Sequence, residues 1–267
     1  MTAPGEARGF SAMAQEYDTL AESHPIVIWM RSRIRRLVER QLSPGASILE
    51  INAGSGLDAA YFAAKGFRVH ATDVAPGMLE AIAGKAANPE LEGRLTYAAL
   101  SFLQLDEAQG GPYDLVFSNL GGLNCTDELG RVGGGLSRVL KPGGSVVLVV
   151  MPPVCPWEMA QALRGHMATA RRRFSKGGTL AKVGGGQVRT WYHAAGGLAG
   201  ALGSEFRVEA VRSLCLFAPP SYFAGFVRRH PRLVRWLMRL DDAAGGRWPF
   251  NRGGDFYALV ARYSPGR

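Results

Sequence analysis

The fold is decided by residues 47–58, which read Ser47-Ile48-Leu49-Glu50-Ile51-Asn52-Ala53-Gly54-Ser55-Gly56-Leu57-Asp58. The stretch opens with a short apolar run of the kind found in strands that are buried on both faces. Gly54 and Gly56 carry no Cβ, so the backbone can turn sharply and come close to a ligand. The residues that follow, 58–65, favour a helix. We therefore predict a strand, a glycine turn and a helix start, an arrangement that suits a nucleotide.

A second strand, residues 67–72, ends on Asp73. An acid at the carboxyl end of the second strand of a βαβ unit can accept hydrogen bonds from both hydroxyls of a ribose. The turn alone is also compatible with an ordinary βα loop, because Asn52 stands where G-x-G-x-x-G has its first glycine. The turn and the acid together indicate a nucleotide site.

Two further acids flank the glycine turn, Glu50 at the end of the strand and Asp58 at the start of the helix. Acids at this place would oppose the pyrophosphate of a dinucleotide, which binds at the positive end of a helix. They suit a ligand with positive charge, such as the amino group and sulfonium of S-adenosylmethionine. The sequence therefore favours a methyl donor over NAD.

Four motifs in the expected order show that residues 46–151 resemble the class I S-adenosylmethionine-dependent methyltransferases. The first motif is Leu49-Glu50 with the glycine turn, and the second is the acid Asp73. The third is the strand 113–120, and the fourth is the turn Leu140-Lys141-Pro142-Gly143-Gly144 before a fifth strand. The resemblance implies a Rossmann-like α/β fold with a mostly parallel seven-stranded sheet and helices on both faces.

Two positions depart from the family pattern. Asn52 replaces the first glycine of the first motif, and Ser101 stands where the family usually carries an acid that accepts a hydrogen bond from adenine. A hydroxyl can accept that bond, and the backbone N–H of Phe102 can meet the ring. We expect a firmer contact to the ribose than to adenine.

The composition is that of a globular α/β protein, with 267 residues and 47% hydrophobic content. No apolar run is long enough to span a bilayer, and the N-terminus lacks the features of a signal peptide, so we expect a cytoplasmic protein. Three widely spaced cysteines predict neither a zinc cluster nor a disulfide framework. The formal net charge of +9 is gathered in arginine clusters near residues 31–40, 164–176 and 228–239. Such clusters bind nucleic acid, anionic lipid or an anionic small substrate, or they are the solvated faces of amphipathic helices.

The order of elements predicts one core with additions. Residues 1–45 are expected to form an N-terminal helical cap, and residues 46–267 a Rossmann-like domain with insertions at 152–190 and 218–254, after the fifth and sixth strands. Strands are predicted near 47, 67, 95, 113 and 144, and then at 206–217 and 255–263. Within the insertions we expect a helix over 157–173, a flexible glycine-rich loop over 176–187 that could act as a lid, and a helix around 221–240.

The resemblance also implies roles for individual residues. The residues that we expect to bind the cofactor S-adenosyl-L-methionine are Tyr17, Glu50, Asn52, Ala53, Gly54, Gly56, Asp58, Asp73, Val74, Met78, Ser101, Phe102 and Asn119. The candidates for catalysis are Asn119, at the end of the fourth strand, and His193, which lies beside hydroxyl and aromatic groups in Thr190-Trp191-Tyr192-His193. No metal is required, because the donor is already activated and the enzyme mainly aligns the acceptor and excludes water.

The sequence thus predicts an enzyme that transfers a methyl group to a small or medium-sized metabolite by direct displacement, acting as a monomer or homodimer. The absence of an N-P-P-Y-like motif after the fourth strand argues against a nucleic-acid base as acceptor. Two alternatives stay open: a methyltransferase of RNA or of a lipid or quinone head group at a membrane surface, and a non-catalytic protein that binds S-adenosylmethionine. The basic helix near 228–239, with its apolar opposite side, favours peripheral membrane contact. The acceptor and the methylated atom are not encoded in any pattern.

Overall fold

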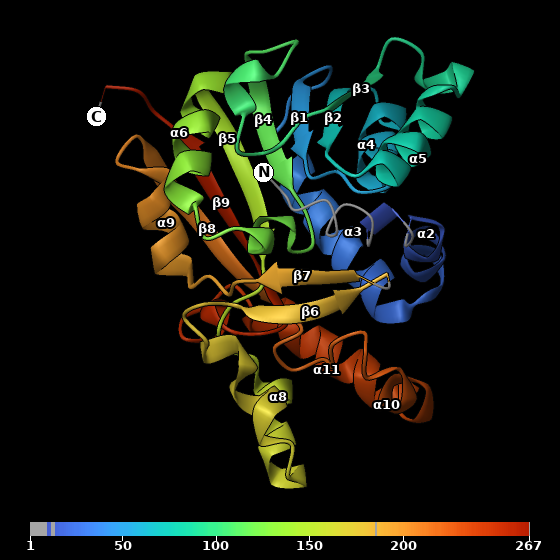
Figure 1. The fold of residues 1–267 in the computed structure, drawn as a ribbon, viewed down its shortest axis with the longest axis vertical. Helices are drawn as coiled ribbons and strands as arrows, with labels where there is room; N and C mark the ends of the chain where they lie inside the picture. The colour runs from blue at the N-terminus through green and yellow to red at the C-terminus, as the bar shows by residue number, and fades with distance from the viewer. Residues whose placement is uncertain (1–9, 12–13, 185, 267) are drawn as a thin grey trace.

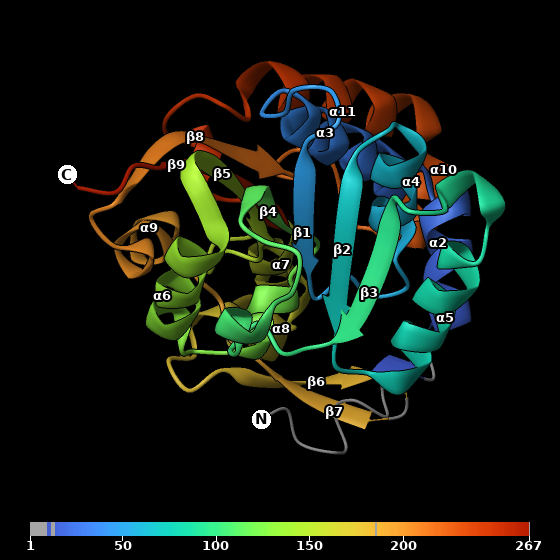
Figure 2. The ribbon, with the colours of Figure 1, turned by 90° about the horizontal axis from the view of Figure 1, so that it is seen from above.

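The computed structural model describes residues 10–11, 14–184 and 186–266, with the backbone alone for residues 14–17. Its centre is a seven-stranded sheet in the order β3-β2-β1-β4-β5-β9-β8 (Figures 1 and 2). The strands are β1 (Ser47–Ile51), β2 (Arg68–Asp73), β3 (Leu95–Ala99), β4 (Tyr113–Ser118), β5 (Leu140–Val150), β8 (Phe206–Leu214) and β9 (Phe256–Tyr263). The first five run parallel, and β9 is antiparallel to both of its neighbours. The predicted fold is confirmed.

Helices cover both faces of this sheet because its central strands are apolar on both sides. In β1, Ile48 packs with the core that contains α3 and α4, whereas Leu49 and Ile51 pack with the core that contains α6 and α9. All three side chains are fully buried. The main helices are α2 (Ala14–Ser23), α3 (Pro25–Glu39), α4 (Leu57–Ala64), α5 (Pro76–Ala86), α6 (Leu129–Val139) and α9 (Ala195–Leu202).

The strand order reverses between β1 and β4, which are sheet neighbours although β2 and β3 lie between them in sequence. In an open parallel sheet, a ligand binds beyond the carboxyl ends of the strands at such a switch point. The turns after β1, β2 and β4 therefore converge on one place, and these turns carry Asn52, Asp73 and Asn119.

The first insertion differs from its prediction in two ways. Residues 157–173 form no single helix but four short pieces, α7 (Pro156–Met159), a 3-10 turn over 160–164, α8 (Met167–Arg171) and a second 3-10 turn over 172–174. The loop expected over 176–187 is a β-hairpin of β6 (Thr179–Val183) and β7 (Gly186–Thr190). Its glycines lie before β6 and at the tip, while Val188 and Thr190 alternate inward along β7, the period-2 signal of a half-buried strand.

The second insertion contains two helices where one was expected, α10 (Ala224–Arg229) and α11 (Pro231–Ala244). Proline disfavours helical backbone at the residue before it, and His230 indeed adopts φ −128° and ψ 53°. Pro231 then occupies the first turn of α11, where its missing N–H costs nothing. Among the described residues, no helix is both long and apolar enough to cross a membrane.

Candidate active site

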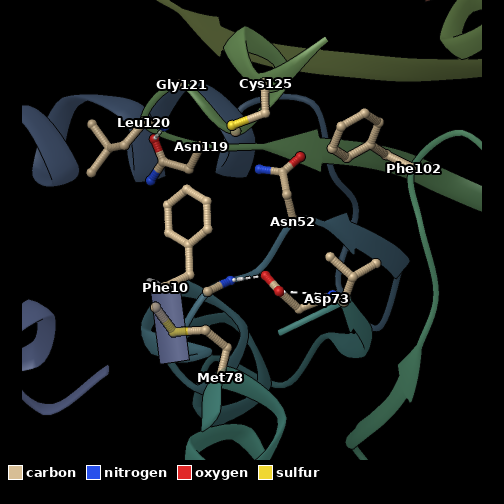
Figure 3. A pocket seen from close by; sticks show the side chains of 12 residues that line it. Phe10, Asn52, Asp73, Met78, Phe102, Asn119, Leu120, Gly121 and Cys125 are labelled. Atoms are coloured by element: carbon tan, nitrogen blue, oxygen red, sulfur yellow. Dashed lines mark hydrogen bonds between the residues drawn. The ribbon is translucent and has the colours of Figure 1, made fainter. Parts of the chain in front are cut away.

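A cavity lies at the carboxyl ends of β1, β2 and β4, at the switch point of the sheet (Figure 3). Its volume is about 700 Å³ with the open mouth included. The described residues that line it are Phe10, Asn52, Gly54, Asp73, Val74, Met78, Phe102, Asn119, Leu120, Gly121, Gly122 and Cys125. Seven of these were predicted to bind the cofactor.

The two glycines of the turn serve different purposes. Both have left-handed backbone, with φ 58° at Gly54 and 76° at Gly56. A Cβ built on Gly54 would meet nothing within 4 Å, so this position offers an open approach to the backbone. A Cβ on Gly56 would lie 2.8 Å from Ile82 Cγ1, so Gly56 allows α5 to pack against the start of α4. Gly54 lines the cavity, whereas Gly56 is not among the described lining residues and instead allows the close packing of α5 against the turn.

Asn52 fits the position of the missing glycine because asparagine tolerates left-handed backbone better than most residues. Its φ is 47°, and its Oδ1 accepts a hydrogen bond from Ser118 Oγ at 2.9 Å. Its Nδ2 is buried at the cavity wall without a hydrogen-bond partner. The side chain packs against Gly122 so closely that a Cβ there would lie 2.0 Å from Nδ2. The cavity thus presents an unused donor, which suits a carboxylate or other acceptor atom of a ligand.

Asp73 faces Asn52 across the cavity (Figure 3). Its Oδ2 accepts a hydrogen bond from the backbone N–H of Gly54 at 2.9 Å, and its Oδ1 accepts from Val74 and Ala75 at 2.8 and 2.9 Å. Burial raises the pKa of this carboxyl, and the three backbone donors only partly offset it. A carboxylate has about four lone-pair sites, so acceptor capacity remains for a hydroxyl of the ligand.

Glu50 lies beneath the turn and is not among the described residues that line the cavity. Its side chain is buried, and Oε2 has no hydrogen-bond partner. Burial and the nearby charge of Asp58 raise the pKa of Glu50 well above the usual value, although Arg31 and Arg35 oppose this. The prediction that Glu50 orients the donor therefore requires an action through the turn rather than a direct contact.

The expectation that Asp58 faces a cationic ligand is wrong. Asp58 is buried and forms ion pairs with Arg31 and with Arg35, whose Nε lies 2.7 Å from Oδ1. Burial alone would raise its pKa, but the two arginines outweigh burial and lower it. The negative charge of Asp58 is thus neutralised by α3, and the ion pairs join α3 to the start of α4. The two arginines lie 27 and 23 residues before Asp58 in the chain, so no local sequence pattern identifies them as its partners.

Asn119 lines the cavity but has both polar atoms engaged. Its Nδ2 donates to Asp58 at 2.6 Å, and its Oδ1 accepts from the backbone N–H of Leu120 at 2.8 Å. The amide therefore holds the turn after β4 in shape. The second N–H of Nδ2 and the second lone pair of Oδ1 remain for a ligand.

His193 does not lie on the cavity wall. Its Nε2 is 3.2 Å from the carbonyl oxygen of Leu123 and 3.0 Å from that of Thr126, so this nitrogen carries the proton and donates to both. Burial is the main influence on its pKa, which is lowered, so the ring is neutral. A nitrogen that donates to two carbonyls cannot act as a general base, and the geometry contradicts a catalytic role through Nε2.

The remaining predicted residues are placed as follows. Ser101 accepts a hydrogen bond from the backbone N–H of Leu103 at 3.2 Å and does not line the cavity, whereas Phe102 does. Ala53 lies in the turn, where its N–H donates to Thr72. Val74 and Met78 line the side nearest α5. Tyr17 lies in α2, but its side chain is outside the described residues.

Five lining residues were missed. Phe10 precedes the described part of α2, and its ring lies between Asn119 and Met78 in Figure 3. The others, Leu120, Gly121, Gly122 and Cys125, follow β4. The pair Gly121-Gly122 after an apolar strand is a usable signal, because it resembles the glycine turn after β1. No comparable pattern marks Phe10.

Comparison with known proteins agrees with this geometry. Residues 48–144 match a family model described as a methyltransferase domain. No curated protein sequence matches the chain. Among solved structures, a methyltransferase from Methanosarcina mazei is similar with 16% identity and a TM-score of 0.58, covering 85% of this chain and 97% of that one. An N1-methyltransferase of 1,6-didemethyltoxoflavin from Burkholderia thailandensis, solved with that compound and S-adenosylhomocysteine, has 18% identity and a TM-score of 0.57 over 99% and 92%. The [4+2]-cyclase SpnF has 17% identity and a TM-score of 0.54 over 88% and 81%.

The chain therefore contains a methyltransferase domain over residues 48–144 and has the fold of the class I S-adenosylmethionine-dependent methyltransferases. Its cofactor is S-adenosylmethionine, which supplies a methyl group activated by a sulfonium. The described residues fit that group, since Gly54 leaves the backbone open, Asn52 Nδ2 is an unused donor and Asp73 is a partly used acceptor. The solved structures share the fold, and their own substrates differ from one another.

Proposed function

We propose that this methyltransferase acts on a small or medium-sized, partly apolar metabolite by direct displacement. The observation that carries the proposal is the position of the β6–β7 hairpin, which lies across the carboxyl ends of the strands, the edge of the sheet at which the cavity lies (Figures 1 and 2). A cover of this kind leaves room for a compact acceptor and limits access for a folded RNA. It also helps to exclude water, which methyl transfer requires.

The hairpin is held to the wall of the cavity at its C-terminal end. The backbone N–H of Trp191 donates to the carbonyl of Asn124 at 2.8 Å, and Asn124 Nδ2 donates back to the carbonyl of Trp191 at 2.6 Å. Asn124 is fully buried and lies next to the lining residue Cys125. A change in the hairpin would thus alter the turn after β4, which shapes the cavity.

The apolar character of the acceptor is inferred from the lining. Phe10, Met78, Phe102 and Leu120 surround the few polar groups of the cavity. Among the described lining residues, Asp73 is the only carboxylate and none is a histidine. We infer that the acceptor atom is already a nucleophile at neutral pH, or that it loses its proton to solvent. We also propose that residues 1–45 form a cap and that the two insertions complete the acceptor side.

The first test is titration calorimetry with S-adenosylmethionine and, separately, with NADH. Binding of the first alone is expected. Formation of S-adenosylhomocysteine is then followed with a panel of small phenols, amines and heteroaromatic compounds, with total tRNA as the rival acceptor. Turnover with tRNA and with none of the small compounds would overturn the proposal.

A shortened hairpin tests the cover itself. Replacing residues 180–189 by a short Gly-Ser linker is expected to leave donor affinity nearly unchanged and to lower turnover by about tenfold or more, because the acceptor is less well aligned and water enters. The control replaces the exposed loop 106–111, which is far from the hairpin in sequence, by the same linker. Equal turnover of both variants would contradict the role of the hairpin.

A further inference from the structure

The positive charge of the chain belongs to the two insertions. Residues 152–190 and 218–254 together carry 14 lysines and arginines against three acids, a net charge of +11. The rest of the chain carries 17 against 19, a net charge of −2. The chain outside the insertions is thus nearly neutral. The overall net charge of +9 therefore understates the positive electrostatic potential near the insertions.

The three acids of the insertions are all engaged. Glu158 is buried and accepts from Arg172, Arg173 and the hydroxyl of Tyr222. Asp241 is buried and accepts from three backbone N–H groups of residues 216–218. Asp242 bonds Arg33 of the cap. These carboxylates therefore do little to neutralise the exposed arginines around them.

The helices α10 and α11 present the strongest patch, which we call the arginine face. It consists of Arg228, Arg229, Arg232, Arg235 and Arg239, which are all exposed. Residues 224–240 contain no acid, and within the described chain none of these five arginines forms an ion pair. Two large apolar side chains lie exposed among them, Leu233 and Trp236, the latter 54% exposed.

A second apolar and basic feature lies on the same insertion layer. The segment from α7 to α8, residues 156–171, protrudes below the sheet in the view of Figure 1, on the side where α10 and α11 also lie. Leu163 is 92% exposed, and Met159 and Met167 are exposed nearby. The base of this segment contacts the second insertion, because the Trp157 ring packs 5.4 Å from that of Phe223 and 5.2 Å from that of Phe226.

We propose that the arginine face and the tip at Leu163 bind the surface of a membrane that contains anionic phospholipid. Arginines attract lipid phosphates and carboxylates, while exposed leucine, methionine and tryptophan side chains enter the boundary between head groups and acyl chains. RNA would use the same charges and a base can stack on Trp236, but Leu163, Met159 and Met167 offer no flat ring for stacking. The exposed aliphatic side chains thus favour lipid. This inference goes beyond the proposed function and does not depend on it.

The experiment is sedimentation of the full chain with vesicles of phosphatidylcholine alone and of phosphatidylcholine with roughly 30% phosphatidylglycerol, at low and high salt. Binding to the anionic vesicles alone is expected, and it should weaken steeply as salt rises. The variant with Arg232→Gln, Arg235→Gln and Arg239→Gln should bind about 100-fold more weakly, because each arginine near an anionic surface contributes roughly fivefold. The matched control removes three exposed arginines of the core, Arg68→Gln, Arg94→Gln and Arg138→Gln, and should bind nearly as well as the unaltered chain.

A charge-preserving pair of changes separates lipid from RNA. Leu163→Gln and Trp236→Gln should weaken vesicle binding while leaving the salt dependence intact, and both positions are exposed enough for the fold to persist. No binding of the unaltered chain to anionic vesicles would overturn the proposal, as would equal losses in the two triple variants. Tighter binding of labelled poly(U) than of vesicles, with no effect of Leu163→Gln, would assign the face to RNA instead. Calorimetry with S-adenosylmethionine on the same variants keeps a failure of this proposal distinct from a failure of the active site.

Discussion

Asn52 shows how one residue can depart from a motif and still preserve its geometry. Its backbone is left-handed, a conformation that glycine adopts without strain, and its side chain adds a bond to Ser118 and an unused donor. We predict that Asn52→Ala is less stable than Asn52→Gly by about 1 kcal/mol, because left-handed backbone is strained for alanine and not for glycine. Chemical denaturation measures the difference. Ser118→Ala, which removes the same hydrogen bond without a backbone change, is the control, and equal stability of the two Asn52 variants would contradict the account.

Asp73 combines a structural and a binding role. We predict that Asp73→Ala weakens binding of S-adenosylmethionine by about 1–3 kcal/mol, since a buried acceptor for a ligand hydroxyl is lost. Three backbone N–H groups lose their partner at the same time, so the free energy of unfolding must be measured alongside calorimetry. Asp106→Ala, at an exposed site, serves as control. Unchanged donor affinity in a folded Asp73→Ala protein would show that the ribose is held elsewhere.

Glu50 predicts a pH effect on stability. Its pKa in the folded state is raised well above the ordinary value of 4.5, mainly by burial. The folded state therefore holds a proton that the unfolded state releases above pH 4.5, and stability is lost as pH rises through the folded pKa. We expect Glu50→Gln to be more stable than the unaltered chain at pH 8, with a gain that vanishes as pH falls toward 4.5. Denaturation at several pH values tests this, and a gain independent of pH would refute it.

At the scale of elements, the turn after β4 depends on a clamp from the end of β7. His193 donates to two carbonyls of that turn, and Asn124 bonds both Met151 and Trp191. We predict that His193→Ala lowers the free energy of unfolding by about 1–3 kcal/mol, because two buried carbonyls lose their donor. His193→Gln, whose amide can still donate, should recover part of the loss and retain turnover. Loss of turnover in a stable His193→Gln protein would instead restore the catalytic assignment.

At the scale of the whole molecule, a buried ionic network joins the first insertion to the last strand. Arg173 bonds Glu158 and Asp255, each at 2.6 Å, across 15 and 82 residues of sequence. Cys155 lies close enough to these two acids to form a cation site with them, but the guanidinium of Arg173 already bonds both. The network therefore holds the first insertion against the core of the sheet.

Removing the cation of this network should be costly. We predict that Arg173→Met destabilises the chain by about 3–5 kcal/mol, because the buried carboxylate of Asp255 loses its counter-charge and that of Glu158 keeps only Arg172. Arg164→Met, an exposed arginine of the same insertion, should change stability little. Thermal unfolding compares the two, and a combined Glu158→Gln, Arg173→Met, Asp255→Asn variant is expected to recover part of the loss. Equal stability of the two single variants would contradict the account.

The sequence determined the sheet and the centre of the site because both depend on local patterns. Apolar strands, the turn at Gly54 and the acid Asp73 are fixed by composition and short spacing, and the mostly parallel sheet follows from alternating strands and helices. Tertiary structure decided the rest. Asp58 forms ion pairs with arginines of α3, and His193 donates hydrogen bonds to carbonyls of a distant turn. The loop predicted at 176–187 contains a hairpin that lies across the strand ends. These outcomes depend on contacts between residues far apart in the chain, and the sequence alone does not show which of these residues come together.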